Sequence, residues 1–270
     1  IVKKHLRYAI EDIGMVSENE EVWWIGNPGY GVTLTKKNGG QWDDKFPDSP
    51  RAKREYIAVN FALDKRFSNN WMAGFNYTWS HLSGNYSGLA ASQAYQLMPN
   101  TDENFDFWYQ SWDAKMRPVD GPLWTDRPHV AKFYGSYTFD FGLTVGVFSQ
   151  ASSGVPNSRK IYVPYPYWAD GLFTDGRTPL RWITNFSVQY TMRLGKNALN
   201  FSLDVDNLFD AKTAERVYDR MNRGSIYVSD DTLLSGTFDY TNQYVPAARF
   251  LMAREFIAPR SARLRIKFTF

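Results

Sequence analysis

The last ten residues of the chain, "SARLRIKFTF" at positions 261–270, decide the class of fold. Apolar side chains at Leu264, Ile266, Phe268 and Phe270 alternate with mostly polar ones, three of which are cations. Successive side chains of a β-strand point to opposite faces of a sheet, so this alternation predicts a strand with one apolar and one charged face. The question that remains is which of the two faces meets water.

The same period of two recurs along the chain, and no segment shows the period of an α-helix. The pattern therefore predicts an all-β fold of about eight strands. The segments expected as strands are 5–12, 56–67, 71–80, 132–139, 143–150, 185–194, 199–206 and 261–270.

The connections between these segments alternate in length. Short turns are expected at 68–70, 140–142 and 195–198. The long connections, which are polar and rich in Pro, Gly and Trp, are 16–54, 83–127, 153–181 and 210–259. Short turns at one end of a sheet and long loops at the other are typical of an outer-membrane β-barrel, with the turns in the periplasm and the loops outside the cell.

The parity of the hairpins agrees with this interpretation, since every predicted register keeps apolar side chains opposite one another. The predicted pairs are Phe67–Trp71, Leu63–Phe75 and Phe61–Tyr77; Phe139–Leu143 and Tyr137–Val145; and Leu194–Leu199, Met192–Phe201 and Tyr190–Leu203. A slip by one residue would turn each apolar set to the other face.

The last two strands predict a charged face. Pairing Val205 with Leu264 brings opposite charges together on the other face of the sheet, which is favourable. The pairs in this register are Asp206–Arg263, Asp204–Arg265 and Ser202–Lys267. We expect a network of charges inside a lumen, which shapes a substrate path or, as we favour, holds the strands together structurally. Its predicted members are Arg193, Asp204, Asp206, Arg263, Arg265 and Lys267.

Composition supports a membrane barrel over a soluble one. The 270 residues include 10 Trp and 17 Tyr, and a soluble core rarely accommodates so many without polar partners. Mean hydropathy is −0.47, and no apolar run approaches the roughly 18 residues of a membrane helix. A net charge of +3 gives no case for nucleic acid, and the absence of cysteine excludes disulfides and thiolate metal sites.

Two sets of residues carry a resemblance to known proteins. The ending "FTF" is similar to the C-terminal signal by which Gram-negative outer-membrane barrels engage their assembly machinery, which assigns Phe268 and Phe270 to an assembly signal. Arg265 stands where that signal usually has Gly. More specifically, four stretches resemble the barrel of Oar-like TonB-dependent receptors. They are "IGNPGYG" (25–31), "LDKRFSNNWMAGFNYTWSHLSGNYSGL" (63–89), "GPLWTDRPHVAKFYGSYTF" (121–139) and "VDNLFD" (205–210).

The resemblance implies a barrel of about 22 strands that encloses a plug. It implies energised passage of a large or scarce ligand across the outer membrane, with TonB as partner through an N-terminal part. We expect residues 1–270 to be part of that one transmembrane β-barrel domain, its C-terminal third, with plug and TonB box outside this chain. Outer-membrane lipid, the barrel assembly machinery and an unknown extracellular ligand are the other expected partners.

One long loop carries the candidate ligand-binding residues, in "NTDENFDFWYQSW" at 100–112. Asp102 and Asp106 could bind calcium, and Trp108, Tyr109 and Trp112 could stack on a ligand. The alternative, which we favour, is that the aromatic residues pack this loop against its neighbours.

No catalytic, cofactor or metal site is predicted. His5, His81 and His129 are far apart and lack the short spacing of metal ligands. Two other functions stay open: a complete small barrel with a structural or adhesive role, and an outer-membrane hydrolase that would use His129, Asp43 or Asp44.

Overall fold

The structure is a computed structural model that describes residues 1–6, 8–9, 11–16, 21–31, 46–88, 104–163 and 165–270. The fold is all-β, as predicted, and its strands pair antiparallel. None of the helices among these residues has the length and apolar character needed to cross a membrane.

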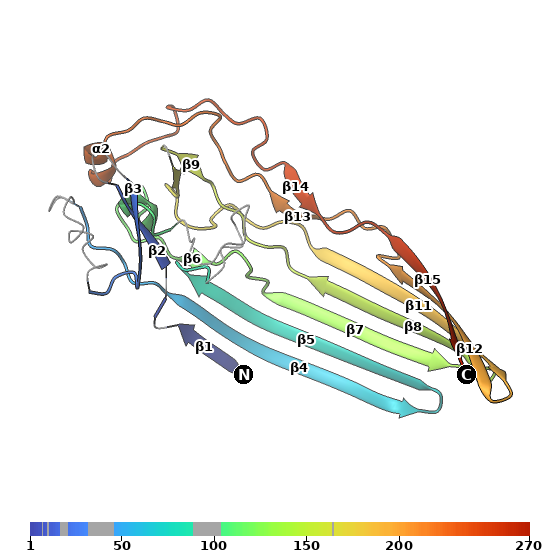
Figure 1. Cartoon of the computed structure of the whole chain (residues 1–270). Coiled ribbons are helices and arrows are strands. Elements are labelled where there is room, and N and C mark those ends of the chain that lie inside the picture. The colour runs from blue at the N-terminus through green and yellow to red at the C-terminus, as the bar shows by residue number, and fades with distance from the viewer. Residues whose placement is uncertain (7, 10, 17–20, 32–45, 89–103, 164) are drawn as a thin grey trace.

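One large sheet holds the strands that the alternating segments predicted (Figure 1). Its neighbours follow the order of the chain, so each strand pairs antiparallel with the next long one. The strands are β1 (Val2–Leu6), β4 (Arg54–Ser68), β5 (Trp71–Gly84), β7 (His129–Thr138), β8 (Leu143–Ser152), β11 (Arg181–Leu194), β12 (Asn197–Asp206) and β15 (Ser261–Thr269), with the short β6 (Gly121–Pro122) beside β5.

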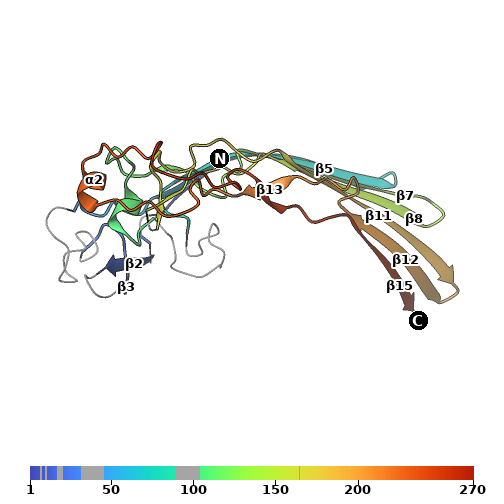
Figure 2. The same ribbon diagram turned by 90° about the horizontal axis from the view of Figure 1, so that it is seen from above.

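The sheet is curved and has two ends of different character. Figure 2 shows β12 and β15 bending away from the plane of β5 and β7. The short turns lie together at one end, and the long connections gather at the other (Figure 1). At the turn end, Asn69 and Asn70 join β4 to β5 with φ of 52° and 65°, the left-handed conformation that Asn tolerates and that tight hairpins require.

The long connections form a loop layer with its own small elements. These are β2 (Glu11–Val16) paired with β3 (Glu21–Gly26), β9 (Ile161–Tyr162) with β10 (Pro166–Tyr167), β13 (Ala214–Val217) with β14 (Ala253–Phe256), the 3₁₀ helix η2 (Trp108–Ser111) and the short helix α2 (Asp230–Leu234).

Most of the buried apolar core of the described residues lies in this loop layer, and little of it on the large sheet. Its main cluster consists of Phe107, Trp108, Tyr109, Ile161, Val163, Tyr167, Ala169, Met221, Ile226, Leu233, Phe238 and Tyr240. The described parts of the long connections are therefore packed against one another.

The predicted pairs Leu63–Phe75, Phe61–Tyr77 and Tyr137–Val145 are confirmed. The predicted pairing of Phe67 with Trp71 is wrong, because the ladder is irregular after Lys65 and Ser68 pairs with Trp71.

The register of the β11–β12 hairpin differs from the prediction by two residues. Leu194 pairs with Asn197 and Tyr190 with Phe201, because Gly195, with φ of 64°, lets the chain turn on two residues instead of four. A shift by two leaves every side chain on its predicted face.

The register of β12 and β15 is also shifted by two residues. Leu203 pairs with Leu264, and Asp204 lies opposite Arg263 instead of Arg265. This register extends the ladder from Ala198–Thr269 to Asp206–Ser261 and places Asp204 between two cations. Asp206 therefore does not pair with Arg263.

The first predicted strand, 5–12, is wrong in its extent. The strand β1 runs from Val2 to Leu6, and Ala9 lies outside any strand. The backbone N–H of Ala9 donates to Oδ1 of Asn27, 3.1 Å away, rather than to a neighbouring strand.

Candidate functional site

One face of the large sheet is apolar across all its long strands. Many of its ladder pairs place apolar side chains side by side, as in the row formed by Val145, Val188, Leu203 and Leu264. Many of these side chains are exposed although they are large. They include Ile57, Val59, Phe61, Leu63, Trp71, Phe75, Trp79, Phe133, Tyr137, Trp182, Met192, Leu194, Leu203, Leu264, Ile266, Phe268 and Phe270.

Aromatic side chains bound this apolar face towards both ends of the strands. Trp71 and Tyr137 pair near the turn end, and Trp79 lies at the loop end beside His129. Trp71 and Trp79 are eight residues apart on one strand, which corresponds to about 26 Å at 3.3 Å per residue. An apolar band about 25 Å tall between aromatic girdles is the outer surface of known outer-membrane barrels.

The opposite face of the sheet is polar and carries the residues of the predicted charge network. Asp204 lies opposite Arg263, and its Oδ2 is 4.0 Å from Nη2 of Arg265 on the diagonal. Lys267 pairs with Asn200, and Arg193 with Ala198. These side chains share one face, as the parity of the strands requires.

A tyrosine covers a glycine on this polar face. The ring of Tyr134 lies over Gly74, its ladder partner, where a side chain on residue 74 would collide with it. The Tyr134 hydroxyl donates to Oδ1 of Asp64 at 2.6 Å. Gly74 therefore makes room for a ring that links β7 to β4 across β5.

The aromatic residues predicted to bind a ligand lie in or near the core of the loop layer. Trp108 and Tyr109 belong to η2 and are buried, and Trp112 packs against the same cluster. The Trp108 Nε1–H donates to Oδ1 of Asp230 at 3.1 Å, and burial raises the pKa of the Tyr109 hydroxyl. Asp106 precedes η2, and contact of these residues with a ligand stays a prediction.

Three acidic residues named in the sequence, Asp102 and the possible hydrolase residues Asp43 and Asp44, lie outside the described part of the chain. The three histidines remain apart and contact different partners. The contacts are His5 Nδ1–Glu55 Oε1 at 3.1 Å, His81 Nδ1–Asp126 Oδ1 at 3.9 Å and His129 Nδ1–Tyr77 hydroxyl at 2.7 Å. Within the described ranges, no group of three or more His, Asp or Glu could hold a metal ion.

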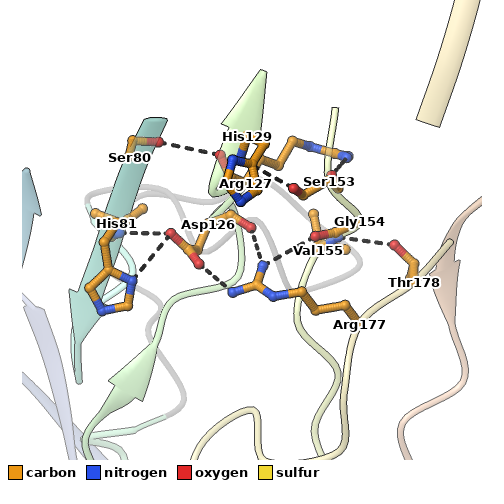
Figure 3. Close-up of polar contacts among 11 residues, drawn as sticks. Ser80, His81, Asp126, Arg127, His129, Ser153, Gly154, Val155, Arg177 and Thr178 are labelled. Carbon is orange, nitrogen blue, oxygen red and sulfur yellow. Dashed lines mark hydrogen bonds and ion pairs between the residues drawn. The ribbon is translucent and has the colours of Figure 1, made fainter. Parts of the chain in front are cut away.

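Asp126 joins the sheet to the loop layer, a role that sequence reasoning missed (Figure 3). Its carboxylate is fully buried and accepts the backbone N–H of Leu82 at 2.7 Å. Arg177, from the connection after β8, forms an ion pair with the same carboxylate and donates to the carbonyls of Asp126 and Gly154. Nothing in the spacing of residues 126 and 177 could have predicted this contact.

The neighbouring Arg127 makes a second link between the same segments. Its Nη1 donates to the carbonyl of Ser153 at 2.7 Å, and the Ser80 hydroxyl donates to the Arg127 carbonyl at 3.3 Å (Figure 3). Burial lowers the pKa of the Arg127 guanidinium, which remains charged at neutral pH because an arginine pKa is so high.

A cavity of about 1050 Å³ opens next to these contacts, against the polar face near its loop end. Side chains from β1, β4, β5 and β7 and from residues 125–127 line it, so strands far apart in the sequence build one site.

The comparison with known proteins points in the same direction. In an alignment of 231 residues that covers 80% of the chain, the sequence is 32% identical to the TonB-dependent transporter Oar of Myxococcus xanthus. The chain is a relative of Oar. The resemblance of its sequence to Oar-like receptors is thereby confirmed.

The match covers only a small part of Oar. The matched region is 20% of the length of Oar, so this chain corresponds to about a fifth of that transporter. No family model matches the chain.

Proposed function

We propose that this chain forms part of the transmembrane β-barrel of a TonB-dependent transporter in the outer membrane of a Gram-negative bacterium. The observation that carries the proposal is the apolar face of the large sheet, on which large side chains are exposed along β4, β5, β7, β11, β12 and β15. Soluble monomers rarely expose contiguous apolar patches above a few hundred Å². Lipid would cover this face without cost, and the polar face would then line the lumen.

The edges of the sheet support a larger barrel. In the described part of the chain, β1 pairs only with β4 and β15 only with β12. Unpaired strand edges are too costly in lipid, so both would pair with further strands of the same barrel. We propose that residues 1–270 are one segment of a single barrel domain of about 22 strands. The plug and the TonB-contacting box would lie elsewhere in the protein.

The loop layer would then face the outside of the cell and the short turns the periplasm. Its packed core suits a structured extracellular surface that contacts an unknown ligand. The segment would contribute no chemistry of its own, and we propose that the protein is not an enzyme. Phe268 and Phe270, whose rings stack 5.8 Å apart, would present the assembly signal to the barrel assembly machinery.

This chain contains no cysteine, so once any cysteine elsewhere in the protein has been replaced, each introduced cysteine can be labelled alone. Spin labels at Ser202→Cys and Leu203→Cys in the protein at its natural length would be placed on opposite faces of β12. In outer-membrane vesicles, the label at 203 should be accessible to lipid-soluble oxygen and the label at 202 to a water-soluble nickel reagent. Equal accessibility at both positions would reject the proposal.

Two further measurements separate the alternatives. A transporter requires a natural mass far above the 31.2 kDa of this chain, whereas a mass close to it would favour a small adhesive or structural barrel. Growth on the transported ligand should fail when TonB is deleted. Hydrolysis of a peptide, ester or phospholipid that is lost in His129→Ala would instead support an enzyme.

A further inference from the structure

The cavity on the polar face carries an excess of positive charge. Four permanent cations line it, and they come from four different segments of the chain: Lys4, Arg54, Arg127 and Lys132. The lining contains one carboxylate, that of Asp126, which is fully buried and ion-paired with Arg177. No other acidic side chain is among the described residues that line the cavity.

Two of these cations have no anionic partner among the described residues. Lys4 lies opposite Tyr56 in the ladder, and Lys132 lies between Asn76 and Gln150, all of them neutral. Elsewhere in the structure the lysines at 53 and 160 form ion pairs with Asp120 and Asp219.

Neutral hydrogen-bonding side chains occupy the region between the two lysines. Asn60, Asn76 and Thr78 all belong to the polar face of β4 and β5 and line the same cavity. Donors and acceptors of this kind bind hydroxyl and carbonyl groups of a polar ligand. These side chains, with the cations, are suited to the hydroxyl and anionic groups of a ligand, while Leu82 and Val130 add apolar contact surface to the same lining.

The ladder gives the length of this site. Lys4 pairs with Tyr56 of β4, and Lys132 is aligned through β5 with Ala62 of β4, six residues further along. The two lysines lie on strands that are three strand spacings apart. At about 3.3 Å per residue and 4.8 Å per strand, their Cα atoms are about 25 Å apart. A ligand that contacts both lysines must therefore be elongated and carry several anionic groups.

We propose that this cavity binds an elongated polyanionic ligand through its carboxylate or phosphate groups. Arg54 and Lys4 would contact it at the loop end and Lys132 deeper on the polar face. The proposal deepens the proposed function, on which it rests for the position of the polar face inside the barrel. It names the ligand of this site by its chemistry: a polar chain with repeated negative charges.

Calorimetric titration of the protein at its natural length, in detergent, tests the proposal with three probes. These are hexameric oligogalacturonate, short inorganic polyphosphate and, as a neutral chain of matched length, maltohexaose. At least one polyanion should bind, with an affinity that falls as salt is added, and maltohexaose should not. Binding by only one polyanion would distinguish carboxylate from phosphate recognition.

Charge-neutral variants locate the site. Lys4→Gln and Lys132→Gln should each raise the Kd about fivefold or more, because a contact that steers and holds an anion is lost. Lys196→Gln removes the same charge from the turn between β11 and β12, outside the cavity, and should leave the Kd unchanged. Heat-modifiable mobility on gels checks that all three variants fold.

Several results would overturn the proposal. They are binding of maltohexaose as tight as that of the polyanions, no binding of either polyanion, or equal effects of Lys4→Gln, Lys132→Gln and Lys196→Gln. Polyanion binding that occurs only after the plug is deleted would show that an acidic plug surface occupies the cavity. The spin-label alternation on β12 is independent of all these titrations, so failure of the transporter assignment is distinguishable from failure of the anion site.

Discussion

Two adjacent residues in the middle of β11 offer a sharp test of which face meets lipid. Val188 lies on the apolar face between Val145 and Leu203. Ser187, the residue before it, lies on the polar face opposite Asp204, beside a cavity of about 430 Å³. Arginine at either position adds one positive charge to the same strand. The side chain at 187 would lie on the polar face of the sheet and the side chain at 188 on the apolar face.

The magnitudes of the two substitutions follow from their surroundings. In Val188→Arg, a guanidinium would face the centre of the bilayer, which costs about 2–4 kcal/mol at the midplane of a barrel. In Ser187→Arg, the guanidinium has open volume and a carboxylate directly across the ladder, a pairing worth a few tenths to about 1 kcal/mol. The two variants should therefore differ by at least about 2 kcal/mol in the free energy of unfolding.

Unfolding by guanidinium in lipid vesicles, followed by tryptophan fluorescence and by heat-modifiable mobility, measures this difference. Ser187→Arg should unfold close to the unsubstituted protein, and Val188→Arg at a clearly lower midpoint or not fold at all. If both variants lose the same stability, or if Ser187→Arg loses more, the assignment of the apolar face to lipid is wrong. On a water-exposed face, both changes would remain within about 0.5 kcal/mol.

Three further substitutions test single contacts. Gly74→Val should displace the ring of Tyr134 and break its hydrogen bond to Asp64, which should lower the unfolding midpoint in the same assay; no shift is expected if the ring does not cover the glycine. Asp126→Asn should cost about 2 kcal/mol and expose segment 153–180 to faster limited proteolysis, because Arg177 loses its charged partner; unchanged cleavage would speak against the link. Phe270→Ser should lower the amount of assembled, heat-modifiable barrel, and an undiminished amount would contradict its role in assembly.

The faces of the strands could be predicted from the sequence because they depend only on local geometry. Side chains alternate along any β-strand, so the parity of Leu203 or Ile266 is fixed by its neighbours in the chain. The positions of the short turns followed from the same logic, since turn residues separate the alternating segments. The relationship to Oar-like receptors was also visible in the sequence, in stretches spread over strands and loops.

The register of two strand pairs could not be predicted in this way. A slip by two residues keeps every apolar side chain on its face, so the apolar pattern alone does not distinguish Leu203–Ile266 from Leu203–Leu264. The tight turn at Gly195 decided one case. For β12 and β15, the register in the structure forms a longer ladder than the predicted one and places Asp204 between two cations.

The amino-acid sequence by itself determined that this protein forms strands with one apolar and one charged face. Only the tertiary structure decided that Asp126 meets Arg177, and that Lys4 and Lys132 border one cavity. Alternation is a property of neighbouring residues, whereas these contacts join segments that long connections separate. Which distant side chains meet depends on how those connections pack against one another, and no local pattern records that packing.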